Sequence, residues 1–114
     1  MVHSGTFPNG IINAAGELCR DFTLCERTFR NTLELANDST VDKELLVEPA
    51  YYDASILSKR LKVVGIDKLT PEMVLDLEGD DGDTLANAIM SLDQRRTEFR
   101  RTQQAAPETP ASFA

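Results

Sequence analysis

The sequence predicts an α+β domain in which a small N-terminal antiparallel β meander packs against about four α-helices, followed by a disordered C-terminal tail. Strand-like alternation and turn dipeptides are confined to residues 1–25. Helical spacing of apolar residues, with capping signals, begins near residue 25 and recurs to residue 101. The last residues are small, polar and proline-containing, a composition typical of disorder. We therefore expect one domain over residues 1–101 and a flexible tail over residues 102–114.

Two turn signals divide the predicted meander into two or three strands. The first is Phe7-Pro8-Asn9-Gly10, which contains the turn dipeptide Asn-Gly, and the second is Ala15-Gly16-Glu17. Residues 18–25 then alternate, with Leu18, Phe22 and Leu24 on one parity and Arg20 interrupting it. A sheet this small is marginal alone, so it must pack against helices.

The two cysteines fall in this segment. Cys19 and Cys25 would lie ~20 Å apart on an extended strand, which is too far for a disulfide. Free thiols fit a reducing compartment.

The first predicted helix runs from about residue 25 to Ala36. Thr23 and Glu26 have the spacing of a capping box at its start. Its apolar stripe consists of Phe29, Leu33 and Ala36, which we expect to face the core.

The second predicted helix begins at Pro49 and ends near Val64, with Gly65 as its C-terminal cap. Before it, residues 41–48 fit either one helical turn or a connector. The apolar stripe of this helix is Ala54, Leu57, Leu61 and Val64, flanked by Tyr52 and Ile56.

Two further helices complete the prediction. Thr70-Pro71 pairs an N-cap with proline at the first helical position and starts a short helix that ends at Gly79. Asp80 or Asp81 then caps a long helix with an arginine-rich end. The expected core stripe of that helix is Leu85, Ala88, Ile89, Leu92 and Phe99.

Charge and composition disfavour several classes of function. The chain of 114 residues carries a formal net charge of -7. That balance opposes binding to nucleic acid or to anionic membranes, which requires basic side chains against phosphates. No apolar run approaches the ~20 residues that span a bilayer, and residues 1–10 do not resemble a signal peptide. We expect a cytoplasmic protein.

Neither catalysis nor a bound metal is predicted. His3 is the only histidine and stands near the terminus, which excludes histidine triads and histidine-containing zinc sites. The acidic run at residues 80–83 fails as an EF-hand loop, because Gly82 at position six would place Leu77 at the first ligand position. The sequence therefore predicts no enzyme, no cofactor and no metal site.

Three stretches carry a family resemblance: FPNGII with GELCRDFTLCERT, then AYYDASILSKRLKVVGIDKLTPEMVLDL, and finally DDGDTLANAIMSLDQRR. The first stretch has a strand, an Asn-Gly turn and a charged strand that leads into a helix. The second has a central helix, a glycine-containing link and a Leu-Thr-Pro helix start. The third has an Asp-Gly start of the last helix. Together they cover residues 5–101. In these features the chain resembles phage tail assembly chaperones of the Mu-like tail group.

The resemblance implies a non-enzymatic factor in the cytoplasm of the bacterial host. Such a chaperone binds the long tape-measure protein and keeps its helical segments soluble while the tail tube protein polymerises around it. It is absent from the finished tail. The sequence leaves homo-oligomerisation open.

For such a protein we expect the client to bind a surface shared by the helices predicted at residues 49–64 and 81–101. Exposed aromatic residues and methionines suit such a surface, because they present adaptable apolar area. The candidate apolar contacts are Tyr51, Tyr52, Met73, Met90 and Phe99, and the candidate charged rim is Arg95, Arg96 and Arg100.

A second hypothesis is a minor structural tail or connector protein that stays in the virion. Purified particles distinguish the two hypotheses, because a chaperone should be absent and a structural protein present in fixed copy number. A nucleic-acid mimic would need negative charge spread over one face, whereas here the acids cluster at turns and helix starts.

Overall fold

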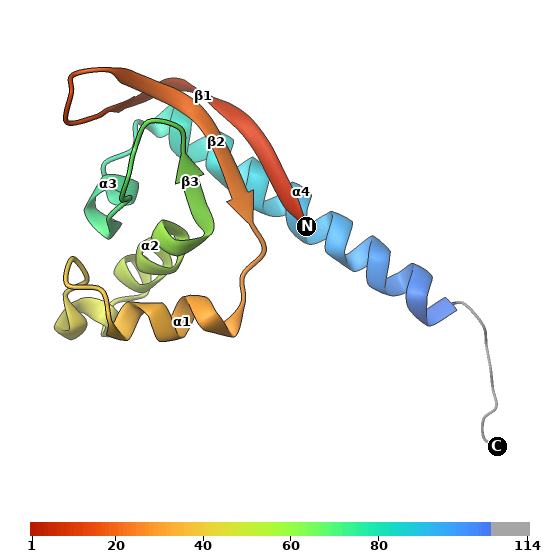
Figure 1. The fold of residues 1–114 in the computed structure, drawn as a ribbon. Helices are drawn as coiled ribbons and strands as arrows, with labels where there is room; N and C mark the ends of the chain where they lie inside the picture. The colour runs from red at the N-terminus through yellow and green to blue at the C-terminus, as the bar shows by residue number, and fades with distance from the viewer. Residues whose placement is uncertain (106–114) are drawn as a thin grey trace.

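The computed structural model describes residues 1–105, and these confirm the predicted α+β class. The three strands are β1 (Val2–Ile12), β2 (Leu18–Cys25) and β3 (Leu61–Val63), and they form one antiparallel sheet in the order β1-β2-β3. The helices are α1 (Phe29–Ala36), the 3₁₀-helix η1 (Lys43–Val47), α2 (Pro49–Arg60), α3 (Pro71–Leu75) and α4 (Gly79–Ala105). Figure 1 shows the helices on one side of the sheet and α4 running out beyond it.

The C-terminal end of the domain differs from the prediction. Helix α4 continues to Ala105, so residues 102–105 of the predicted tail are helical. The remainder of that tail, residues 106–114, lies outside the described residues.

The predicted meander of residues 1–25 is a two-stranded hairpin, and the Asn-Gly dipeptide does not form its turn. Strand β1 runs through Asn9 and Gly10, where its pairing with β2 shifts register between Thr6 and Ile11. The chain reverses instead at residues 13–17. The predicted parity of β2 holds for Phe22 and Leu24, which are buried. It is reversed beyond the bulge, where Cys19 is buried and Leu18 is 56% exposed.

The third strand comes from the segment predicted as the end of the second helix. Helix α2 ends at Arg60, and residues 61–63 pair with β2 instead of continuing the helix. Leu61 and Val63 therefore face the core as alternate strand residues, while Val64 is 71% exposed. Gly65, predicted as a helix cap, has φ +96° in the turn that follows β3.

The helix starts were predicted with mixed success. Thr70 caps α3 as expected, its Oγ1 accepting from the backbone N of Met73 at 3.2 Å. The predicted capping box from Thr23 to Glu26 is wrong, because residue 23 lies within β2 and α1 begins only at Phe29. There the Asn31 side chain accepts from the backbone N of Thr28 at 2.7 Å.

The main core lies between the inner face of the sheet and the first half of α4. Phe7 and Phe22 stack across the hairpin with ring centroids 4.4 Å apart, and Leu85, Ala88 and Leu92 of α4 pack in the same core cluster. These three residues confirm most of the predicted α4 stripe. Ile89 is half-buried, while Phe99 is 56% exposed and does not belong to the core.

Asp81 joins the start of α4 to the bulge of β1. It was predicted as a possible N-cap, but α4 begins at Gly79 and the Asp81 side chain is fully buried. Its carboxylate accepts from the backbone N of Asn9 at 2.9 Å and of Gly10 at 2.8 Å. Arg20 Nε donates to the carbonyl of Phe7 at 2.8 Å on the same bulge. The backbone groups freed by the bulge are thus bound by side chains.

Candidate protein-binding surfaces

The apolar stripe of α1 faces solvent, which contradicts the prediction that it faces the core. Phe29 is 75% exposed and Leu33 is 54% exposed, and Ala36 on the same stripe is also exposed. The buried residues of α1 are Asn31 and Leu35, which lie on the opposite side of the helix. Leu35 packs there in a second core cluster with residues of α2. Because exposed apolar residues at helical spacing form a continuous strip, this stripe is a candidate binding surface.

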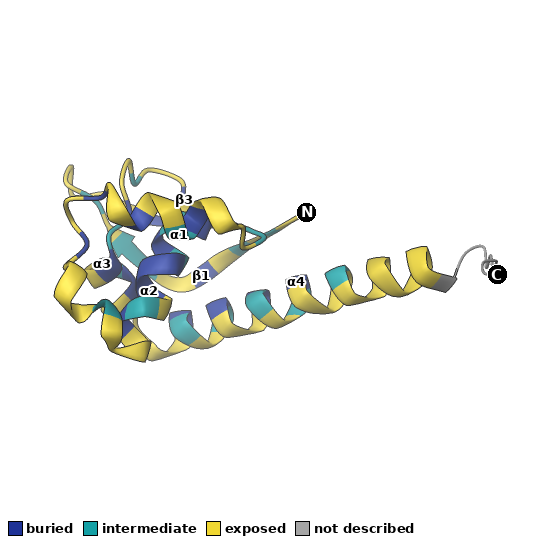
Figure 2. Ribbon diagram, turned by 90° about the horizontal axis from the view of Figure 1, so that it is seen from below, coloured by how far each residue is buried: buried dark blue, intermediate teal, exposed yellow. Residues whose placement is uncertain are grey.

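Four of the predicted contacts lie together on the second half of α4. Arg95, Arg96, Phe99 and Arg100 follow Leu92, the last buried residue of the helix. Figure 2 shows burial confined to the first half of α4, while the second half extends away from the body of the protein. Phe99 continues the core stripe of the helix but is exposed, because the sheet and the other helices end before it.

The arginines near the middle of α4 have contacts of their own. Arg95 Nη2 donates to the carbonyl of Val2 at 2.5 Å, which binds the start of β1 to the helix. Arg96 Nη2 lies 3.6 Å from the Asp93 carboxylate, one turn earlier. Arg100 is exposed.

The two tyrosines at the start of α2, both predicted as contacts, differ in burial. Tyr51 is 6% exposed, and its hydroxyl accepts from the backbone N of Asp42 at 2.7 Å. It therefore supports η1 from the second core cluster and offers no surface to a partner. Tyr52 is half-buried, and its hydroxyl accepts from Arg27 Nη2 at 2.9 Å.

Replacing Tyr51 by phenylalanine should lower the free energy of unfolding by about 1 kcal/mol, because the backbone N of Asp42 loses its acceptor. Binding to the client protein that the sequence resemblance implies should be unchanged, since the side chain is buried. Urea denaturation followed by circular dichroism measures the first effect. A Tyr51→Phe protein that is as stable as the wild type but binds client less well would contradict this placement.

The two methionines among the predicted contacts, Met73 and Met90, do not lie with the other candidates. Met73 is half-buried against the main core, and Met90 is 59% exposed on the outer side of α4. The sequence suggested a client surface shared by α2 and α4. The two helices do not pack mainly on each other, so the structure does not form that shared surface as its main feature. Helix α2 packs chiefly on α3, and α4 packs on β1.

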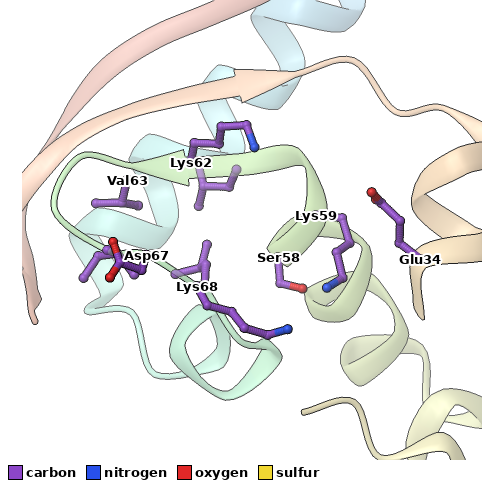
Figure 3. Close-up of a pocket in the computed structure, with 10 residues that line it drawn as sticks. Glu34, Ser58, Lys59, Lys62, Val63, Asp67 and Lys68 are labelled. Carbon is purple, nitrogen blue, oxygen red and sulfur yellow. The ribbon is translucent and has the colours of Figure 1, made fainter. Parts of the chain in front are cut away.

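A polar hollow of about 270 Å³ lies between α2, β3 and the loop that follows β3. Figure 3 shows Lys59, Lys62 and Lys68 around it, with Glu34 and Asp67 at its sides. Lys59 and Lys68 both form salt bridges with the buried Asp38, the latter at 3.1 Å. The single carboxylate of Asp38 is thus shared by two of the three lysines, and Glu34 and Asp67 add negative charge at the border of the same hollow.

The side chains that usually hold a metal ion do not gather within residues 1–105. No cluster of three or more His, Cys, Asp or Glu side chains there could hold a metal ion. Cys19 and Cys25 are both free thiols, as predicted. Within the same residues, no helix combines the length and apolar character needed to cross a bilayer. Comparison of the chain with models of protein families, with curated proteins and with solved structures finds no match.

Proposed function

We propose that this chain is a non-enzymatic tail assembly chaperone that binds a phage tape-measure protein and keeps it soluble while the tail tube protein polymerises. The resemblance of residues 5–101 to such chaperones supports this proposal. The structural observation that carries it is the exposed α1 stripe of Phe29, Leu33 and Ala36. A helical client with an apolar face would bury that face against this stripe.

The charge of the chain suits a protein that keeps an apolar client in solution. With a formal net charge of -7, copies of the complex repel one another even when the client is uncharged. The same charge opposes association with nucleic acid or anionic membranes, so the partners in this proposal are proteins. Tyr52, Met90 and Phe99 remain candidate secondary contacts, because each is at least partly exposed.

The test is co-expression with the tape-measure protein encoded beside this chain, followed by measurement of soluble client and by affinity purification. A soluble complex that forms only when the chain is present would support the chaperone function. If the tape-measure protein is equally insoluble with and without it, and nothing co-purifies, the proposal fails. Detection of the chain in fixed copy number in purified particles would favour a structural tail protein instead.

Replacing both Phe29 and Leu33 by serine should reduce the recovery of soluble client at least tenfold, because the apolar stripe is removed. Stability should change by no more than about 0.5 kcal/mol, since both side chains are already exposed. Val47→Ser is the matched control, because Val47 is 82% exposed but lies outside α1. Equal client recovery with the double variant and the control would exclude the stripe as the binding surface.

A further inference from the structure

All four lysines of the chain gather around one buried aspartate and the polar hollow beside it. Lys59 and Lys68 bind the two oxygens of the Asp38 carboxylate, and the Lys43 ammonium donates to the Asp38 carbonyl at 2.8 Å. Lys62, the fourth lysine, lines the hollow together with Lys59 and Lys68. The four residues belong to η1, α2, β3 and the loop after β3, so the tertiary fold brings them together.

The ammonium groups of Lys59 and Lys68 are held side by side at the hollow. The Lys59 side chain is 15% exposed and that of Lys68 is 55% exposed, while the Asp38 side chain that they share is 2% exposed. Figure 3 shows both ammonium groups ending near the hydroxyl of Ser58. An ammonium group carries three N–H donors, and a bond to one carboxylate oxygen uses one of them. Each lysine can therefore bind an anion in the hollow without releasing Asp38.

The charge at the hollow differs from that of the protein as a whole. Lys59, Lys62 and Lys68 line it together with the carboxylates of Glu34 and Asp67, so lysines outnumber acids by three to two. The chain as a whole has a net charge of -7. Exposed charges more than about 8 Å away are largely screened at physiological salt, so an anion in the hollow interacts mainly with the groups that line it.

We propose that this hollow is a binding site for a phosphate group, held by Lys59 and Lys68 and by Lys62 at the border. The three lysines come from different elements and match the three or more acceptor oxygens of a phosphate group better than the two of a carboxylate. An ammonium group is a point charge that imposes no plane on its partner, which suits a tetrahedral ion. This inference does not depend on the proposed function.

A bound phosphate group would link two parts of the fold. Lys59 belongs to α2 and Lys68 to the loop that follows β3, and at present Asp38 is the group that joins them. A ligand that contacts both lysines in the native state and neither in the unfolded chain stabilises the protein. Phosphate should therefore raise the melting temperature more than sodium chloride does at the same ionic strength.

The test is titration of the ¹⁵N-labelled chain with inorganic phosphate at constant ionic strength, followed by amide chemical shifts. Saturable shifts should appear at residues 58–69, which include most of the lining of the hollow. Lys62→Gln and Lys68→Gln should each weaken binding about threefold, and Glu34→Gln should strengthen it about twofold. The matched control is Arg101→Gln, which removes one positive charge at an exposed position on α4 and should leave binding unchanged. Circular dichroism shows whether each variant is folded.

Several outcomes would overturn the assignment. Shifts that do not saturate, or lysine variants that bind phosphate as tightly as Arg101→Gln, would show only general screening of charge. Acetate that binds as tightly as phosphate would assign the hollow to carboxylates. Titration with a phosphoserine peptide distinguishes the source of the phosphate group. Tighter binding of the peptide supports a phosphorylated side chain as the ligand, and tighter binding of inorganic phosphate supports the free ion.

Discussion

Replacing Asp81 by alanine should lower the free energy of unfolding by about 3 kcal/mol, because the β1 bulge loses its charged acceptor. The carboxylate is fully buried and accepts from the backbone N of both Asn9 and Gly10, and weakly from Asn9 Nδ2 at 3.4 Å. Hydrogen bonds to charged groups contribute about 1.5–3 kcal/mol each, and the two backbone bonds share one carboxylate. In a domain of this size, the expected fall in melting temperature is about 12–24 °C.

Asp83→Ala is the matched control for this prediction. Asp83 belongs to the same acidic start of α4 but is exposed. Its replacement should change stability by no more than about 0.5 kcal/mol. Thermal and urea denaturation followed by circular dichroism compare the two variants. If Asp81→Ala and Asp83→Ala are equally stable, the bond between α4 and the bulge does not stabilise the fold.

The role of Asp81 illustrates what the sequence could not predict. An aspartate near the start of a helix indicates an N-cap, and the local pattern contains nothing that points to a partner 72 residues earlier. Asn9-Gly10 likewise indicates a turn when only its neighbours are considered. The tertiary fold places the start of α4 beside β1, and the Asp81 carboxylate therefore binds the backbone of Asn9 and Gly10.

Local signals succeeded where local interactions decide the structure. Thr70 and Pro71 specify the start of α3 within one turn, and the structure has that cap. The strand β3 was missed for the opposite reason. Leu61 and Val64 continue a helical spacing from α2, and only the pairing of residues 61–63 with β2 ends the helix at Arg60.

For the candidate surfaces too, the sequence indicated the local helical pattern but not the tertiary contacts around it. Periodicity identified the apolar stripe of α1 but placed it on the wrong side, because the cluster around Leu35 draws the opposite face of the helix inward. In α4, periodicity identified the face that carries Phe99 but gave no information about where the body ends.

Asp38 should make the fold sensitive to acid. It is almost fully buried, and it binds Lys59, Lys68 at 3.1 Å and both the backbone N and the hydroxyl of Thr40, at 2.8 and 2.7 Å. Burial alone would raise the pKa of this carboxyl, but the bonds from Lys59, Thr40 and Lys68 outweigh burial and hold the pKa well below its ordinary value. A depressed pKa means that the unfolded chain binds the proton more tightly, so stability is lost as the pH falls. The free energy of unfolding should therefore be nearly constant above about pH 5 and should decrease below about pH 4.

Replacing Asp38 by alanine tests this assignment at neutral pH and in acid. At pH 7 the variant should lose about 3–5 kcal/mol, because the half-buried Lys59 ammonium is left without its carboxylate. The difference between wild type and variant should shrink as the pH falls below about 4, since protonation removes the same interaction from the wild type. Asp67→Ala is the control, because Asp67 borders the same hollow but is exposed. Parallel loss of stability in the wild type and in Asp38→Ala between pH 5 and pH 2 would assign the acid sensitivity to other carboxylates.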